Sequence, residues 1–297
     1  MPSTYTKLRY HLIFRCCDQQ PLITPEHRGE LYPYISGIIS NHRGKLLQIG
    51  GMTDHIHILA GIHPSVAVAS MVRLIKANSS KWLNKRGPHP SWFRWEPGYG
   101  AFTVSETEVP KVGKFIVDQE EYHQRQSFAD EFGRFAEQHG FEFKEDGSHG
   151  RRRTYAWLRI HIVFSTKDRM ELIAPSVQDE LFTTIREVVA QKRGELIEID
   201  GAAEHVHLLV AIAPAVAVVD LLRPVKNESS RWMARQSDAE LPFAWQRGYG
   251  AFSVSLSQMP VVVRYIQQQK SHHQTISFAD EFRKLLEEHG LVLRYSM

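Results

Sequence analysis

The stretch that decides the fold of this chain reads DHIHILAG at residues 54–61, and it returns as EHVHLLVA at residues 204–211. On a strand, alternate side chains point to the same face, so His55 and His57 share one face and the aliphatic residues take the other. The flanking residues differ between the copies while both histidines remain. The stretch therefore predicts a strand with one polar face that occurs twice.

The whole chain is written twice in the same way. A constant shift aligns Thr4 with Thr154 and continues without a gap to the end of the chain. A length of 297 residues suits two domains, each large enough for its own core. We expect domains at residues 1–147 and 154–297, joined by a short polar linker at 146–153.

Each repeat shows the same order of expected elements. In the first repeat, periodicity and turn residues predict strands at 8–15, 45–49, 55–61 and 100–105, and helices at 25–42, 66–85, 109–125 and 127–140. This order predicts an α+β protein with two tandem ferredoxin-like domains. Each domain would have an antiparallel sheet with helices on one face and an extra C-terminal helix. We expect the domains to pack as a pseudo-twofold dimer that needs no further oligomerisation.

Composition sets broad limits. The apolar fraction of 42% and charged fraction of 23% are ordinary for a globular protein, and no apolar run approaches the ~18 residues of a membrane span. The two cysteines, Cys16 and Cys17, have no counterpart in the second repeat. We therefore expect a cytoplasmic protein without a membrane partner. A net charge of +3 permits nucleic-acid binding but does not itself indicate it.

The histidine pair is a candidate metal site. Two imidazoles on one strand face can hold a divalent cation, and the same pattern gives His205 and His207 in the second repeat. The alternative is a pair of exposed strand histidines.

A later helix offers two further groups. Tyr265 and Gln269 are four residues apart and would lie on one helix face. Glutamine supplies a neutral oxygen ligand, and tyrosine supplies a phenol that is a nucleophile once deprotonated. The first repeat has Gln119 but carries Phe115 in place of the tyrosine. The alternative is that Tyr265 and Phe115 are equivalent half-buried aromatic residues of a helix, since an exchange of Tyr for Phe is also expected at such a position.

Candidate contacts to a nucleic acid occur on the second long helix and the loop after it. Basic and hydroxyl residues recur there at i, i+3 and i+7, a spacing that can follow a phosphate backbone; an ordinary solvated face is the alternative. The loop carries aromatics beside glycines, which can stack on unpaired bases or pack in the core. The candidates are Arg73, Lys76, Ser80, Trp95 and Tyr99, and in the second repeat Arg223, Lys226, Ser230, Trp245 and Tyr249.

Taken together, these motifs resemble those of the HUH single-tyrosine transposases of small bacterial insertion sequences. The resemblance covers nearly all of both repeats. It rests on DHIHIL and EHVHLLV, on YIQQQ at 265–269, and on the shared IKANSSKW, VKNESSRW, WEPGYGAFTVS and WQRGYGAFSVS segments. It implies an enzyme that cleaves and rejoins single-stranded, hairpin-forming DNA. It also implies that the histidine pair and the glutamine bind Mg²⁺ or Mn²⁺ while the tyrosine forms a 5′-phosphotyrosine.

The chain departs from this family because it fuses two domains, of which only the second carries the motif tyrosine. In the family the tyrosine helix of one subunit often serves the histidines of the other. The resemblance therefore favours an exchanged site of His55, His57, Tyr265 and Gln269. A site within the second repeat is the alternative. Tyr122 is a minor candidate for a substitute nucleophile.

Two other functions fit the same residues. A non-catalytic, domesticated relative would bind DNA hairpins without forming an adduct. A metal-dependent phosphoesterase would use water and turn over without a covalent intermediate.

Overall fold

The structure is a computed structural model, and it describes residues 4–86, 92–143, 154–236 and 243–293. The described residues form mixed five-stranded sheets with helices, which confirms the α+β class. The expected linker at 146–153 lies outside the described residues. Among the helices that the structure describes, none is long and apolar enough to cross a membrane.

The chain divides into two compact units, each with one sheet. The first-repeat unit consists of Arg9–Val104 and Glu108–Trp157. The second-repeat unit consists of Met1–Leu8, Ser105–Thr107 and Leu158–Met297. Each unit therefore takes most of its residues from one repeat and a short piece from the other.

The first-repeat unit follows the predicted order of elements closely. Its elements are β2 (Arg9–Arg15), η1 (Cys17–Gln19), α1 (Pro25–Asn41), β3 (Lys45–Gly51), β4 (His55–Gly61), α2 (Val68–Asn84), β5 (Tyr99–Thr103), α3 (Val109–Val117), α4 (Gln119–Tyr122), α5 (Phe128–Gln138) and β6 (Thr154–Trp157). A short 3-10 turn, η2 (Glu106–Glu108), precedes α3.

The second-repeat unit has the matching elements. They are β1 (Tyr5–Lys7), β7 (Arg159–Ser165), η3 (Lys167–Arg169), α6 (Pro175–Gln191), β8 (Gly194–Ala202), β9 (His205–Ile212), α7 (Val218–Gln236), β10 (Gly250–Ser253), η4 (Leu256–Gln258), α8 (Met259–Gln267), α9 (Gln269–His272) and α10 (Phe278–Glu288).

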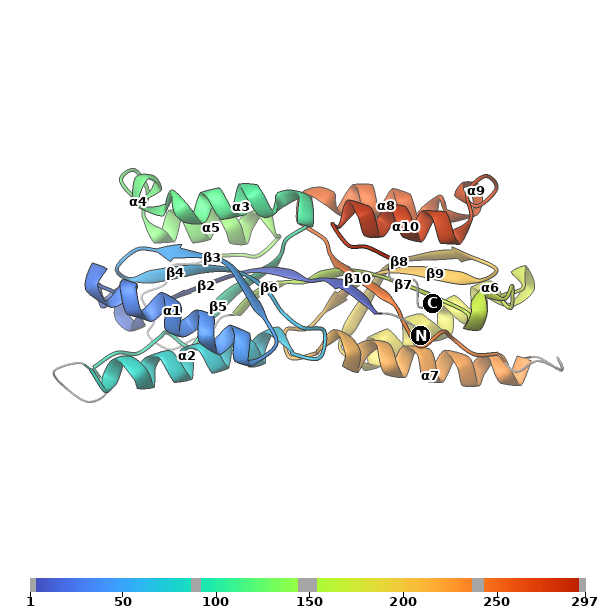
Figure 1. Cartoon of the computed structure of the whole chain (residues 1–297), viewed down its shortest axis with the longest axis horizontal. Coiled ribbons are helices and arrows are strands. Elements are labelled where there is room, and N and C mark those ends of the chain that lie inside the picture. The colour runs from blue at the N-terminus through green and yellow to red at the C-terminus, as the bar shows by residue number, and fades with distance from the viewer. Residues whose placement is uncertain (1–3, 87–91, 144–153, 237–242, 294–297) are drawn as a thin grey trace. The chain divides into compact units, whose positions relative to one another are not determined.

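The sheet of each unit is covered on both faces. The strand orders are β3-β4-β2-β5-β6 and β1-β10-β7-β9-β8. Figure 1 shows α1 and α2 on one face of the first sheet and α3 and α5 on the other; α6 and α7 oppose α8 and α10 in the second unit. The histidine strands β4 and β9 are interior strands and buried along their whole length.

An exchanged edge strand, absent from the sequence prediction, completes each sheet. Strand β1 starts the first repeat, yet it pairs in parallel with β10, with Tyr5 opposite Gly250. Strand β6 pairs in parallel with β5 in the same manner, so the wholly antiparallel sheet expected for each domain was wrong. Within the second-repeat unit, the Ser105 amide donates to Ser255 Oγ at 2.7 Å and the Ser255 amide donates to Ser105 Oγ at 2.8 Å.

The helix predicted at 109–125 is broken in two. In the first repeat α3 ends at Val117 and α4 begins at Gln119; in the second, α8 ends at Gln267 and α9 begins at Gln269. The residue at the second break, Gln268, leaves helical geometry with φ −97° and ψ 8°. The single continuous helix expected from the sequence was therefore wrong, and the break falls between Tyr265 and Gln269.

The last helix forms where the sequence predicts it. The Ser127 side chain accepts from the Asp130 amide, and the Asp130 carboxylate accepts from the Ser127 amide, which satisfies two free donors of the first turn. Phe132 and Ala136 turn the apolar face of α5 inward. Gly140 ends this segment at φ +79°, a conformation that glycine adopts without strain.

Candidate metal centre and nucleophile

The four motif histidines lie inside the protein. Exposure is 1% for His55 and 0% for His57, and both His205 and His207 are at 0%. The alternative of exposed strand histidines is therefore wrong. A buried imidazole needs a partner for each ring nitrogen that carries a proton or lone pair.

Each ring of the second-repeat pair has its Nδ1 fixed by a neighbour. His205 Nδ1 lies 3.2 Å from Glu204 Oε1, and His207 Nδ1 lies 3.0 Å from Nε2 of the buried His161. Partners of this kind set the tautomer and orientation of metal-binding histidines. Both rings are thus oriented with Nε2 toward the α9 and α10 side chains. The first-repeat counterparts are Asp54, at 2.8 Å from His55, and His11, at 2.9 Å from His57.

The predicted glutamine joins this cluster. Gln269 is fully buried, and its Oε1 lies 3.0 Å from His205 Nε2. The break before α9 places this side chain at the start of its own short helix. Gln119 occupies the same position in the first repeat, 3.2 Å from His55 Nε2.

A glutamate that the sequence analysis missed completes each cluster. Glu281, from α10, is 3% exposed. Its Oε1 accepts from Gln269 Nε2 at 2.8 Å, and its Oε2 lies 3.4 Å from His207 Nε2. Glu131 takes this role in the first repeat. The available signal was the repeated FADEF segment, which keeps a carboxylate on the buried face of an amphipathic helix.

These residues fit a divalent cation. The Nε2 atoms of His57 and His207 are buried and have no hydrogen-bond partner. In each repeat a group of two imidazoles and this glutamate, namely His55, His57 and Glu131 or His205, His273 and Glu281, has ligand atoms within 4.8 Å of one another. Imidazole nitrogen is a ligand for divalent transition metals and carboxylate or amide oxygen is a ligand for Mg²⁺ and Mn²⁺, so this mixed set fits a divalent cation.

The cluster holds its groups in the protonation states that a cation requires. Burial lowers the pKa of His207 to about 4, although Glu281 acts in the opposite direction, so the imidazole is neutral near pH 7. Burial alone would raise the pKa of Glu281, but the adjacent His207 and the hydrogen bonds from Tyr265 and Gln269 hold it well below its usual range. A neutral imidazole and an ionised carboxylate are the ligand forms of both groups.

Tyr265 reaches the cluster from the last turn of α8. Its hydroxyl donates to Glu281 Oε1, and its ring meets the His207 ring edge-on at 5.6 Å. Burial raises the pKa of this phenol, and the adjacent Glu281 charge raises it further. Phe115 occupies the corresponding place, 5.7 Å from the His57 ring.

The tyrosine is grouped with the histidines of its own repeat. Tyr265, Gln269 and His207 all belong to the second-repeat unit. This is the alternative arrangement, and not the exchanged set with His55 and His57 that the family resemblance favoured. Tyr122 packs edge-on against Phe115 at 5.3 Å.

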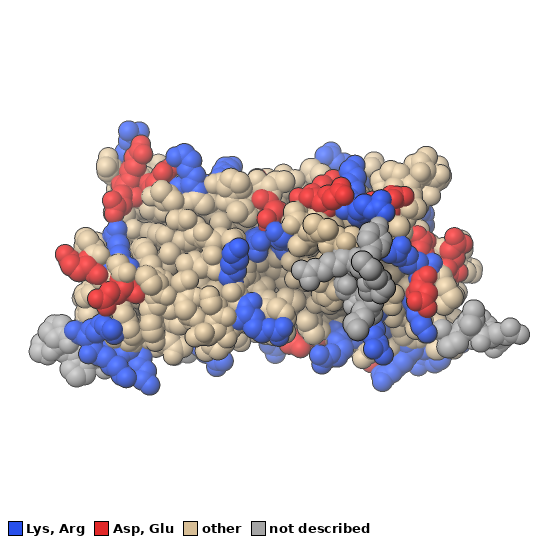
Figure 2. Space-filling model, viewed as in Figure 1, with Lys and Arg blue, Asp and Glu red and all other residues tan. Residues whose placement is uncertain are grey.

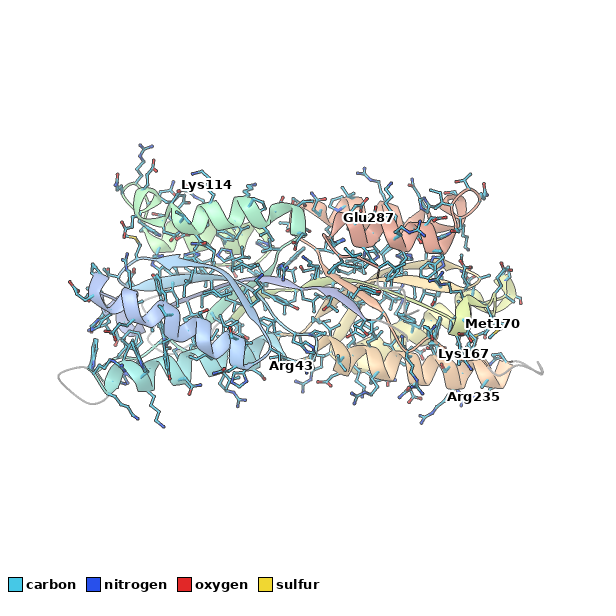
Figure 3. The ribbon with its side chains drawn as sticks, viewed as in Figure 1. Arg43, Lys114, Lys167, Met170, Arg235 and Glu287 are labelled. Atoms are coloured by element: carbon cyan, nitrogen blue, oxygen red, sulfur yellow. The ribbon has the colours of Figure 1, made fainter. Side chains whose placement is uncertain are left out.

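The structure separates the predicted DNA contacts into exposed and inward-facing groups. Arg73 and Arg223 are exposed, and Ser80 and Ser230 are half-buried. Figure 2 shows lysine and arginine side chains gathered over α2 and α7, and Arg235 near the end of α7 is labelled in Figure 3.

The lysines of this set have other partners. Lys226 Nζ donates to the carbonyls of Gln246 and Gly248, both at 2.7 Å, and Lys76 makes the equivalent bonds to its own loop. Burial lowers the pKa of Lys226 to about 7. Tyr249 is half-buried with its ring 5.9 Å from this ammonium group, and Tyr99 is placed likewise beside Lys76.

The loop tryptophans are core residues in this structure. Trp95 and Trp245 are each 8% exposed. The Trp245 indole donates to Ser229 Oγ at 2.8 Å, and Trp95 donates to Ser79 at the same distance. Base stacking needs an open ring face, so the structure supports core packing, the competing role, for both residues.

One family of known proteins matches both repeats, and individual relatives match part of the chain. The family described as "Transposase IS200 like" matches residues 4–119 and 154–269. The ISDra2 transposase TnpA of Deinococcus radiodurans is 29% identical over 117 residues, covering 38% of this chain and 84% of that protein. The transposase for insertion sequence element IS200 of Salmonella typhimurium is 26% identical over 96 residues, covering 31% of this chain and 63% of the relative.

One solved structure bears on the same comparison. A REP-associated tyrosine transposase bound to a REP hairpin matches with 15% identity and a TM-score of 0.34, covering 43% of this chain and 76% of that chain. A TM-score at this level does not establish a common fold.

Proposed function

Because the chain belongs to the family of IS200-like transposases, we propose that it cleaves and rejoins single-stranded DNA through a covalent bond to Tyr265. The observation that carries the proposal is the grouping of the Tyr265 hydroxyl with His205, His207 and Gln269 around the buried Glu281. A nucleophile and a set of cation ligands thus share one cluster.

The proposed reaction is a transesterification. Tyr265 Oη attacks phosphorus, the bond from phosphorus to the 3′-oxygen breaks, and a 5′-phosphotyrosine and a free 3′-hydroxyl result. The tyrosyl hydroxyl initially donates its proton in a hydrogen bond to Glu281 Oε1. In the balanced reaction this proton ends on the leaving 3′-oxygen. Rejoining reverses these steps with a new 3′-hydroxyl.

The residues that would hold the cation have ligand atoms that lie close together in the cluster. They are His205, His207, Gln269 and Glu281. A divalent cation such as Mg²⁺ or Mn²⁺ held by these residues would polarise the scissile phosphate and offset the charge that develops in the transition state. The remaining task of the protein is to exclude water and to hold Tyr265 beside its phosphate.

DNA binding is proposed for the basic faces of α2 and α7 and for the segment that follows each helix. Exposed arginines at corresponding positions in the two repeats support it. The residues proposed to contact DNA are Arg73, Ser80, Tyr99, Arg223, Ser230 and Tyr249.

We also propose that residues 1–147 and 154–297 are two ferredoxin-like domains, each of which supplies most of one unit, and that the two work as an intramolecular counterpart of a dimer. The strand order β3-β4-β2-β5 supports the ferredoxin-like topology. The matching ligand sets of the two repeats support the comparison with a dimer.

The proposal is tested by trapping the adduct. The full chain is incubated with labelled hairpin-forming single strands, with Mn²⁺ or with a chelator, and resolved on a denaturing gel. We expect a cation-dependent adduct that is lost in Tyr265→Phe. His205→Ala should abolish it while His55→Ala, its matched control, should leave it.

Other results would lead to different conclusions. An adduct in Tyr265→Phe would exclude this nucleophile. Loss of the adduct in His55→Ala but not in His205→Ala would support the exchanged site. Hairpin binding without an adduct under any cation would instead indicate a non-catalytic binding protein.

A further inference from the structure

The two clusters contain the same types of side chain, but they differ in one hydrogen-bond donor and in the glutamate oxygen that faces the second motif histidine, which accepts from the glutamine only in the first repeat. In each, a glutamate oxygen lies 3.4 Å from the Nε2 of the second motif histidine. In each, the glutamate also accepts from a glutamine amide and from the histidine that directly follows α4 or α9, His123 at 2.8 Å and His273 at 3.0 Å. The two clusters are therefore a natural comparison pair.

The extra donor is the Tyr265 hydroxyl. It donates to the same Glu281 oxygen that accepts from Gln269. Phe115 has no hydroxyl, so Glu131 Oε1 accepts from Gln119 Nε2 at 3.1 Å without a phenol beside it. His272 Nε2 lies 3.9 Å from Glu281 Oε1, beyond hydrogen-bond range.

A hydrogen bond to a carboxylate oxygen stabilises its negative charge and occupies a lone pair that a cation would otherwise use. Bonds of this type are about twice as strong as those between neutral groups. A cation that approaches Glu281 must therefore weaken an interaction that is absent at Glu131. A second difference acts in the same direction, because Asp54 lies closer to His55, at 2.8 Å, than Glu204 does to His205, at 3.2 Å.

We propose that the Phe115 cluster is the tighter of two divalent-cation sites, and that Tyr265 weakens cation binding at its own cluster by engaging Glu281. The inference rests on the cation site of the proposed function. It assigns the first repeat a cation site that has no nucleophile beside it. At the second cluster, cation binding loosens the contact that restrains the Tyr265 hydroxyl.

The test is a Mn²⁺ titration of the full chain at pH 7.5 without DNA, with free Mn²⁺ measured by electron paramagnetic resonance. We expect a tight site and a weak site. Glu131→Gln should remove the tight one and Glu281→Gln the weak one. Tyr265→Phe should tighten the weak site about tenfold, and Phe115→Tyr should weaken the tight site by a similar factor.

The variants are matched so that a folding defect is recognisable. Each exchange at 115 or 265 introduces the residue that the other repeat already carries, and urea unfolding checks that stability is kept. Two sites of equal affinity in the wild type, or an unchanged weak site in Tyr265→Phe, would overturn the inference. If neither glutamate variant alters Mn²⁺ binding, the cation site itself is misassigned. A normal titration without any DNA adduct would refute only the proposed reaction.

Discussion

His161 offers the sharpest test of how the cluster is built. It is 3% exposed, and its Nε2 shares a 3.0 Å hydrogen bond with His207 Nδ1. His161→Leu would keep most of the side-chain volume and remove this partner. His207 would then lose the contact that fixes its tautomer and leave Nδ1 buried without a partner. Loss of such an outer contact typically weakens metal binding about 10- to 100-fold, or ~1.4–2.7 kcal/mol.

The measurement is Mn²⁺ affinity, with His11→Leu as the matched variant in the other repeat, where His11 lies 2.9 Å from His57. Each variant should weaken one site and leave the other unchanged. Urea unfolding of the metal-free proteins separates this effect from a general loss of stability. Wild-type Mn²⁺ affinity at both sites in His161→Leu would refute the reasoning, since it would mean that His207 is oriented without His161.

Three further predictions follow from the same contacts. Ser229→Ala should lower the free energy of unfolding by about 1–3 kcal/mol in urea titrations, because it leaves the buried Trp245 indole without its acceptor. The metal-free protein should lose stability as pH falls from 6.5 toward 4, because burial lowers the pKa of His207 to about 4 and the unfolded chain then binds the proton more tightly. The free energy of unfolding should be about 2 kcal/mol lower at pH 5 than at pH 8. Equal stability at these two pH values would contradict the prediction. Arg223→Ala should weaken hairpin binding for all sequences and reduce its salt dependence by about one ion, whereas an unchanged salt slope in fluorescence anisotropy would place the DNA elsewhere.

Much of each unit could be predicted because the relevant signals are local. The alternation that begins at His55 predicts a strand, and β4 has the predicted bounds of His55–Gly61. Helix α1 begins at Pro25, as its turn residues indicate. The shared strand face of the histidines likewise follows from the periodicity of a strand alone.

The remaining features depend on contacts between distant segments. No local pattern links Tyr5 to Gly250, so the parallel pairing of β1 could not be predicted. Glu281 is twelve positions beyond Gln269 and joins the cluster only when α10 folds back. A lysine at helical spacing is expected to be solvent-exposed, but Lys226 donates hydrogen bonds to loop carbonyls. Helical periodicity cannot predict this contact.

The exchange of β1 and β6 means that the unit of duplication in this chain is not its unit of folding. A gene truncated after residue 147 would encode every cation ligand of the first cluster, yet it would lack β6, the edge strand of the first sheet. It would also leave β1 without β10, its partner strand. Two copies of such a half could restore both pairings by exchanging strands with each other, as the two repeats do within one chain. Fusion of the repeats makes this exchange independent of protein concentration. It also keeps the Phe115 cluster and the Tyr265 cluster in one chain.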